Sequence, residues 1–472
     1  MTAKMSAKNS ITLKAVICLA LFLIISFLTP PEGLERSSMI CLAVLVSVIF
    51  SVSTNLMDEF LSGSLGLILL SFLRVADFKT VFSGFSSTTF ILLLGAFGMG
   101  GVLSQCGALQ RIGSAIVSKF PKTFRGRVTA MYIAGMVISP TMPSGSAKGI
   151  IMSLLSTPVA KEMGYKPKSQ AGTGLFIAGW IPVGVIGICF LSGAVSGPLL
   201  AGMTDAEYLG EYTWVKWFLN SLVFGIVMLI GCYIANLILY KPRPEDMEQN
   251  FSDIDTTSEK TPMTFKQKLS LVVVCAVLLL WIFGRSLKLT DAVVSFAGFV
   301  LLVLMGVVDR KKALSTAVPW GTLIFSAFVL SISTVITEVG LGDWLTSILG
   351  SFLIPVMNNM PVFIALTCIG IYIIRTVVIS QTLITSMMYM LLMPIAVKAG
   401  INPWIIGFLC AVSIVTWNVL PQSIPFLSAF GASDGGEYPS FPQAFKMSVF
   451  VMLWTIVSCW ASIPVWKLMG MM

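Results

Sequence analysis

Two polar stretches interrupt long apolar segments, and their residue types are suited to binding an anion. The first tip is PTMPSGS at 140–146, within residues 128–160, and the second tip is SQT at 380–382, within 361–398. A helix that restarts after each tip points free N–H groups and its positive dipole end at the tip, and both attract anions. Ser and Thr hydroxyls can cap such helices or donate to a carboxylate, and glycine permits close approach. The predicted binding residues of the two tips are Ser144, Gly145, Ser146, Ser380, Gln381 and Thr382.

Two basic residues beside the tips indicate the charge of the cargo. Lys148 lies two positions after Ser146, and Arg375 lies five positions before Ser380. A cation near the centre of a membrane costs about 2.5–3.5 kcal/mol on insertion scales, so its presence requires a compensating interaction. Contact with an anionic substrate is one such interaction. An ion pair, or a side chain that reaches the membrane surface, is the alternative.

The positions of the acidic residues and the absence of histidine limit the chemistry that the chain can carry out. Asp58 and Glu59 fall at a predicted loop, Asp291 at the start of a span and Glu338 near the end of one, so no acidic residue is expected at a break and no proton relay is indicated. The chain contains no histidine, which excludes Ser-His and Cys-His nucleophiles and His-ligated metal sites. A membrane enzyme is therefore disfavoured, and no cofactor is predicted.

The composition requires a membrane to surround these segments. Hydrophobic residues make up 56% of the 472 residues and charged residues only 11%, too few to cover a water-soluble surface. The formal charge of +9 comes from basic residues that gather at span ends, as the positive-inside rule predicts, so a nucleic-acid partner is not expected. We predict an all-α polytopic membrane protein with spans near 11–29, 37–53, 60–73, 87–106, 171–190, 214–239, 267–284, 290–308, 320–339, 403–420 and 442–466.

The two interrupted segments are predicted to turn back rather than cross. Basic clusters flank both ends of 128–160, which places both ends on the cytoplasmic side, whereas 361–398 has few basic residues around it and is predicted to open externally. A second pair of breaks, 192–198 and 421–425, follows in the same order. We therefore predict an inverted repeat with two re-entrant hairpins. Its parts are an N-terminal span and loop (1–36) with a cytoplasmic N-terminus, a first repeat (37–240), a cytoplasmic linker (241–266) and a second repeat (267–472).

Several short motifs give the chain a family resemblance over nearly its whole length. They are FSGFS at 82–86, SP at 139–140 with PSGSAK at 143–148, GPL at 197–199, PWG at 319–321 and SQT at 380–382. With these motifs the chain resembles the divalent anion/sodium symporter family, particularly its citrate/dicarboxylate exchanger branch. The resemblance implies eleven spans with two re-entrant hairpins, a homodimer and an elevator-like movement of the transporting part.

The resemblance also implies how the breaks combine into a binding site. The first tip would join the 192–198 break, including Ser196 and Gly197, and the second tip would join the 421–425 break, including Gln422 and Ser423. In symporters of the family these regions also bind Na⁺, which would place a Na⁺ ion near Ser144, Gly145, Gly193 and Ser380.

Two departures from the family pattern bear on the coupling ion. The first tip has Gly145 where the family has Asn and Ser146 where it has Thr, and the break at 196–198 lacks an Asn often found there. The missing Asn residues remove amide oxygens that a hard cation could use. Lys148 matches a basic position of the exchanger branch and can supply positive charge in place of Na⁺. The expected function is exchange of small organic dianions such as succinate, malate or citrate across a bacterial cytoplasmic membrane. Na⁺-coupled symport of the same substrates, or transport of sulfate or a sulfonate, is the alternative.

Overall fold

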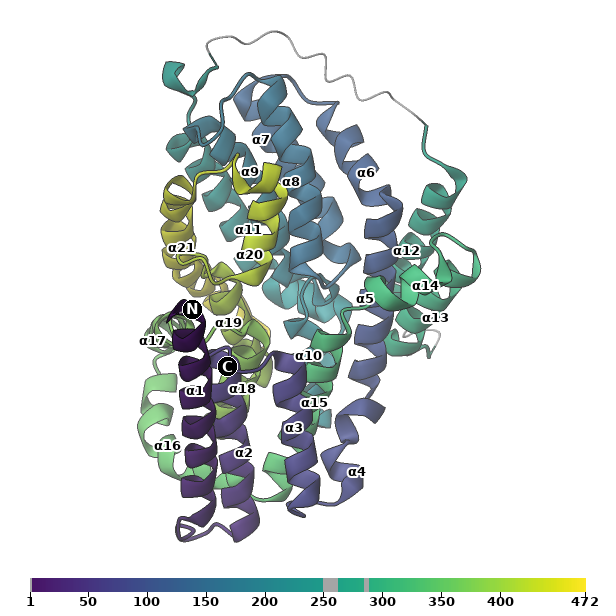
Figure 1. Cartoon of the computed structure of the whole chain (residues 1–472). Coiled ribbons are helices and arrows are strands. Elements are labelled where there is room, and N and C mark those ends of the chain that lie inside the picture. The colour runs from purple at the N-terminus through teal and green to yellow at the C-terminus, as the bar shows by residue number, and fades with distance from the viewer. Residues whose placement is uncertain (1, 249–261, 284–287) are drawn as a thin grey trace.

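Helices account for the architecture of the chain, as the composition predicts. The computed structural model describes residues 2–248, 262–283 and 288–472 (Figure 1). Within these ranges, eight helical segments are long and apolar enough to cross a membrane: Ser10–Phe27, Arg36–Ser53, Thr88–Cys106, Gln170–Cys189, Trp214–Leu239, Phe265–Phe283, Trp320–Glu338 and Phe441–Leu468. Helices suit this environment because lipid offers no partner for a free backbone N–H or C=O group.

Three predicted spans coincide with shorter helices. These helices are α3 (Glu59–Phe72), α13 (Asp291–Leu304) and α19 (Pro403–Thr416), each of 14 residues. The all-helical polytopic class is confirmed, whereas a count of eleven crossings and the inverted sense of the repeat stay predictions. Residues 249–261 of the expected linker and residue 284 of the expected span 267–284 lie outside the described residues.

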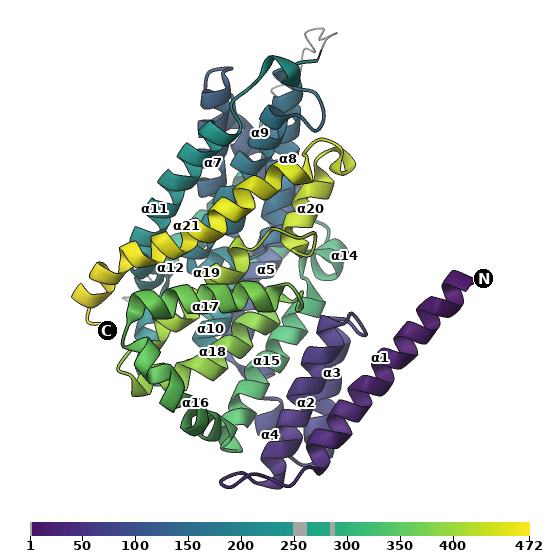
Figure 2. The same ribbon diagram turned by 90° about the vertical axis from the view of Figure 1, so that its left-hand side faces the viewer.

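The N-terminal helices form a bundle at one end of the molecule. Helix α1 (Thr2–Phe27) packs along α2 (Arg36–Ser53) and leans away from the rest of the chain (Figure 2). Helix α3 packs on α2 and on α15 (Trp320–Glu338). The contact with α15 is close, because a Cβ atom built at Gly63 would lie 2.9 Å from the Phe325 ring. The α3 helix is therefore held by its neighbours in this bundle.

Each tip separates two helices, as predicted from the polar interruptions. Helix α7 (Phe124–Ile138) ends in a 3₁₀ turn, and α8 (Gly145–Glu162) starts directly after Ser144. In the second segment, α17 (Met360–Arg375) precedes the tip and α18 (Gln381–Lys398) starts after Ser380. The direction in which these helix pairs enter a membrane remains a prediction.

The other pair of breaks also lies between helices. Helix α9 (Gln170–Trp180) continues through a π turn and a 3₁₀ turn to Cys189, and α10 (Ser196–Gly202) follows. In the second half, α19 is followed by α20 (Ile424–Ala432). The expected continuous span at 171–190 is thus helical but irregular in its second half, with Pro182 at the start of the π turn.

Two helices that the hydropathy pattern did not predict occupy the same place in the two halves of the chain. Each follows a long helix directly after a glycine turn. Helix α5 (Thr88–Cys106) ends at Gly107 in the left-handed region (φ 71°), and α6 (Ala108–Val117) follows. Helix α15 ends in the same way near Gly340 (φ 68°), and α16 (Leu341–Met357) follows. A positive φ lets glycine reverse the chain at low cost, so each long helix turns directly into a second one.

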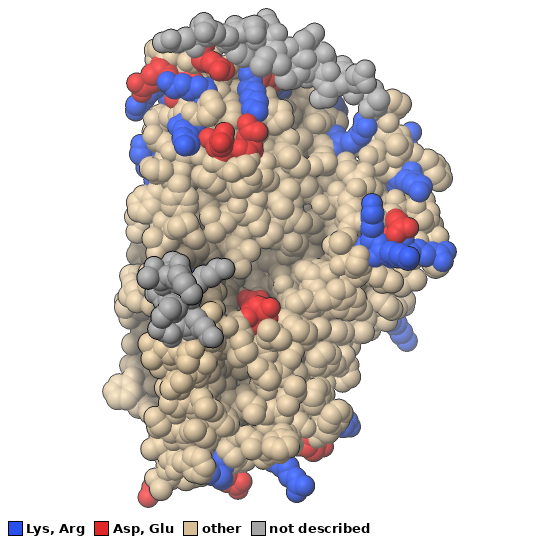
Figure 3. Space-filling model, in the orientation of Figure 1, with Lys and Arg blue, Asp and Glu red and all other residues tan. Residues whose placement is uncertain are grey.

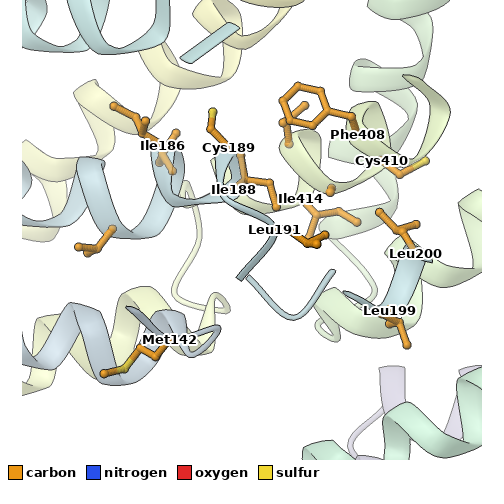
Figure 4. Packing of buried hydrophobic residues seen from close by; sticks show 14 of the residues in the cluster. Met142, Ile186, Ile188, Cys189, Leu191, Leu199, Leu200, Phe408, Cys410 and Ile414 are labelled. Atoms are coloured by element: carbon orange, nitrogen blue, oxygen red, sulfur yellow. The ribbon is translucent and has the colours of Figure 1, made fainter. Parts of the chain in front are cut away.

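An aromatic core joins the irregular segment that follows α9, here called the break after α9 (residues 181–195), to helices from both halves. Phe408 of α19 stacks on Trp404 at 4.7 Å between ring centroids and contacts Trp217 of α11 (Trp214–Leu239). The Trp217 indole N–H donates to the Ile188 carbonyl (2.8 Å), which gives one irregular backbone group a partner. Figure 4 shows side chains of the surrounding core from the break (Ile188, Leu191), α10 (Leu200) and α19 (Phe408, Ile414).

Charged side chains are rare on the middle part of the surface. Figure 3 shows basic and acidic residues at the upper part, the right edge and the lower end of the molecule. The surface between them is mostly uncharged, with one acidic patch beside a hollow near the middle. This distribution fits a chain whose middle faces lipid.

We expect Phe408→Ala to destabilise the protein strongly, because its side chain is fully buried and the substitution leaves a cavity. Loss of a buried phenyl group costs about 3–5 kcal/mol. The melting temperature in detergent measures the effect, with Phe352→Ala as the control because Phe352 is 74% exposed. Equal melting temperatures for the two variants would contradict the role of this core.

Candidate functional site

A cavity of about 310 Å³ lies where the breaks of the two halves meet. Both tips line it, together with parts of α9, α10, α19 and the start of α20. Predicted binding residues that line the cavity are Ser144, Gly145, Ser146, Ser196, Ser380, Gln381 and Thr382. The structure therefore brings together residues that lie about half of the chain apart in sequence.

Four helices point their N-terminal ends at this cavity. Ser144 caps α8, with its Oγ accepting from the Ala147 N–H (3.2 Å), and Ser380 caps α18, with its Oγ accepting from the Leu383 N–H (3.1 Å). Helix α10 begins at Ser196, and α20 begins at Ile424, which also lines the cavity. The positive dipole ends and free N–H groups of these helices make the cavity attractive to an anion.

Two polar groups on the cavity wall are buried without a hydrogen-bond partner among the described residues. They are the Oγ of Ser196 and the indole N–H of Trp180. A buried donor or acceptor left unpaired is costly. Neither atom has surface open to the cavity, so the structure shows neither as a contact for a ligand.

Lys148 lies behind the first tip rather than on the cavity wall. Its side chain is fully buried, and its Nζ donates to the carbonyl of Gly193 (2.6 Å) and to that of Ser139 (3.2 Å). The ammonium therefore joins the end of α7 to the break after α9. Gly187 lies close beside it, since a Cβ atom there would come within 3.1 Å of Nζ.

Arg375 occupies an analogous position behind the second tip. Its Nη1 donates to the carbonyls of Val378 (3.2 Å) and Ile379, the two residues directly before Ser380. The guanidinium group stacks over the Trp417 ring at 4.9 Å. Nε and Nη2 of Arg375 have no hydrogen-bond partner among the described residues. Within the residues that the structure describes, neither Arg375 nor Lys148 forms an ion pair with a carboxylate.

The other predicted residues differ in whether they reach the cavity. The Gln381 side-chain amide donates to Ser423 Oγ (3.3 Å), which links the second tip to the turn before α20. Gly197, Gln422 and Ser423 belong to the breaks but do not line the cavity. Gly193 lines it and contributes its carbonyl to Lys148, so the Na⁺ ion predicted near this glycine would meet an ammonium group instead.

One residue of the cavity wall is an acid that the sequence pattern placed in a loop. Glu59, the first residue of α3, accepts a hydrogen bond from Ser380 Oγ (2.5 Å) across a sequence separation of 321 residues. The expectation that no acidic residue reaches a break is therefore wrong. Its position next to Asp58, a helix cap, gave no signal for this contact, because the partner comes from the other half of the chain.

The cavity wall carries several groups that can bind an anion. Hydroxyls and helix N-termini line the space together with the Glu59 carboxylate, and the cations of Lys148 and Arg375 lie behind it. Such donors recognise the oxygen atoms of a carboxylate or a similar oxyanion.

Comparison with known proteins gives consistent matches. The family described as "Sodium:sulfate symporter transmembrane region" matches residues 9–468. The chain is 22% identical over 477 residues to dicarboxylate transporter 2, chloroplastic, of Spinacia oleracea, covering 96% of this chain and 82% of the relative. It is 23% identical over 395 residues to the L-tartrate/succinate antiporter of Shigella dysenteriae, covering 78% and 80%.

A solved structure shares the fold. The crystal structure of the Alcanivorax borkumensis YdaH transporter matches with a TM-score of 0.60 and 15% sequence identity, covering 92% of this chain and 99% of that chain. At this level of identity the likeness concerns the fold alone.

We expect Gly193→Ala to disrupt the contact between Lys148 and the break after α9. A Cβ atom at this position would lie 2.0 Å from the Gly187 carbonyl oxygen, so the backbone around Gly187 and Gly193, which lies against the ammonium, must shift. The destabilisation should reach about 1–3 kcal/mol, as for other overpacked sites, and is measured as a lower melting temperature. Gly431→Ala on α20 is the control, because a Cβ there meets no atom within 4 Å. An unchanged melting temperature for Gly193→Ala would show that the break is not packed as described.

Proposed function

Because this chain belongs to the sodium:sulfate symporter family, the divalent anion/sodium symporters that its sequence resembles, we propose that it transports small dicarboxylates by exchange. Membership makes it an integral membrane transporter and not an enzyme. The names of relatives support the substrate class, since they include a dicarboxylate transporter and an L-tartrate/succinate antiporter. A secondary carrier of sulfate or a sulfonate is the alternative that the same chemistry allows.

The observation that carries the substrate class is the pairing of two capped helix N-termini across one cavity. Ser144 with α8 and Ser380 with α18 lie on opposite halves of the chain, and each offers a hydroxyl and free N–H groups. A dicarboxylate has an anionic group at each end, so one molecule can satisfy both tips at once. The cavity of about 310 Å³ is at the lower end of the range for small-molecule sites, which suits a short diacid.

Exchange is favoured over Na⁺ symport because fixed cations bind carbonyls directly before the tips and in the first break. Lys148 donates to the Ser139 and Gly193 carbonyls, and Arg375 donates to those of Val378 and Ile379. Carbonyl oxygens are ligands for hard cations such as Na⁺, and here ammonium and guanidinium groups occupy them. A cation that is part of the chain cannot dissociate on either side, so substrate transport needs no ion gradient.

We further propose that the protein lies in a bacterial cytoplasmic membrane with a cytoplasmic N-terminus, and that it forms a homodimer. The basic residues near the N-terminus and around 119–127 and 161–168 support this orientation. The elevator-like alternating access implied by the resemblance would carry the tips and their cavity from one side of the membrane to the other.

Proteoliposome uptake of labelled succinate tests the proposed function. We expect uptake to require unlabelled dicarboxylate inside the vesicles and to ignore an inward Na⁺ gradient. Uptake that is driven by Na⁺ without internal substrate would establish symport instead. An absence of succinate uptake under both conditions, together with uptake of labelled sulfate or a labelled sulfonate, would move the assignment to another oxyanion.

We expect Lys148→Ala to reduce the kcat/KM for a dianion by at least roughly tenfold, equivalent to about 1.4 kcal/mol. The buried positive charge behind the first tip is lost, so a second negative charge on the substrate is stabilised less; a monoanion should lose less. Exchange kinetics with succinate and a monocarboxylate measure the difference. Lys161→Ala on the same helix is the matched control, since Lys161 forms an exposed ion pair with Asp434. Equal losses for both substrates would indicate a structural role of Lys148.

A further inference from the structure

Glu59 enters the cavity from a different part of the fold than the tip it contacts. Its helix, α3, packs on α2 and α15, and a Cβ at Gly66 would lie 2.8 Å from the Phe328 ring of α15. The second tip begins α18, which packs mainly on α16 and α19. The Glu59–Ser380 hydrogen bond is the side-chain hydrogen bond that the described residues show between α3 and α18.

The Ser380 hydroxyl can serve only one acceptor at a time. Its oxygen already accepts from the Leu383 N–H as the helix cap, and its single proton is donated to Glu59 Oε1 (2.5 Å). A substrate carboxylate that takes the Ser380 hydroxyl must therefore displace the Glu59 carboxylate. Two carboxylates at such short range also repel each other, which favours the departure of Glu59 when a substrate carboxylate arrives.

Glu59 thus has the features of an internal stand-in for the substrate. Its carboxylate lies at the N-terminal end of α18 and lines the same cavity as both tips. It forms none of the ion pairs found in the described part of the chain, so the Ser380 hydroxyl and the α18 terminus are the favourable partners it has there. A negative group at this place is stabilised by the helix dipole, as a substrate carboxylate would be.

We propose that Glu59 is a latch that holds the second tip to the α2–α3–α15 bundle when the carrier is empty and is displaced by one carboxylate of the substrate. The proposal rests on the proposed function, because it requires a dicarboxylate that binds at Ser380. The bond across the two parts hinders movement of the empty carrier, and substrate binding removes it. Transport then occurs in both directions only with substrate bound, which is the behaviour of an obligatory exchanger.

The test compares the wild-type chain with Glu59→Ala and Glu59→Gln in proteoliposomes. Three quantities are measured: the affinity of the purified protein for succinate, succinate–succinate exchange, and efflux of preloaded succinate into substrate-free buffer, which requires return of the empty carrier. Asp58→Asn is the matched control, because it removes the neighbouring charge while Asn can still cap α3 at the Leu61 N–H. Size-exclusion profiles establish that each variant is folded.

We expect Glu59→Ala to bind succinate at least about fivefold more tightly, the lower end of typical couplings between sites, because no competitor remains. Exchange should be retained, and efflux into substrate-free buffer should rise by a similar factor. Glu59→Gln keeps an oxygen acceptor without the charge, so its values should fall between those of wild type and Glu59→Ala. Asp58→Asn should behave as wild type.

Three other outcomes would overturn the latch. Unchanged affinity and efflux in both Glu59 variants would show that the contact does not restrain the empty carrier. Loss of binding and exchange in a folded Glu59→Ala would make the carboxylate part of a substrate, proton or cation site. If Asp58→Asn changed affinity and efflux as much as the Glu59 variants do, the effect would come from the loss of local negative charge and not from the contact with Ser380. Failure of the proposed function is distinguished in the wild type alone, by an absence of succinate binding and exchange.

Discussion

A helix that breaks inside a membrane leaves backbone carbonyl and N–H groups that lipid cannot satisfy, and the structure is organised around supplying partners for them. The N–H groups at the tips are capped by Ser144 and Ser380 and otherwise face the cavity. The carbonyls before the tips receive Lys148 and Arg375. The irregular backbone after α9 is fixed by side chains, such as the Trp217 indole on the Ile188 carbonyl and the Ser192 hydroxyl on the Pro140 carbonyl.

This arrangement separates charges of opposite sign by position. The cations lie behind the tips, where carbonyl oxygens and the Trp417 ring surround them, and the helix N-termini face the cavity. Glu59 is the acidic group on the cavity wall and comes from α3. The site is therefore prepared for negative charge, and in the structure that charge comes from the chain itself.

Sequence reasoning located the tips because a polar cluster within a long apolar run has few structural explanations. It also identified both buried cations, since Lys148 and Arg375 are unusual at such depth. It could not predict that their side chains turn toward carbonyls rather than the cavity, because that direction depends on contacts such as Gly187 beside Nζ. Glu59 was missed for a similar reason. It directly precedes an apolar run and so resembles an ordinary helix start, and its partner lies 321 residues away. Helices α6 and α16 follow turns at Gly107 and Gly340 that hydropathy does not report.

The attachment of both cations to the chain has a consequence for the membrane voltage. Under the proposed elevator movement, Lys148 and Arg375 cross the electric field together with the tips behind which they lie. A bound dianion cancels their charge, so the loaded carrier moves as a neutral unit. An empty carrier would move two positive charges, each worth about 2.3 kcal/mol per 100 mV of potential. Under the proposed exchange, the two fixed charges would match those of a dianion, so exchange of one dianion for another would be electrically silent, whereas movement of the empty carrier would be opposed or driven by the potential of the cell.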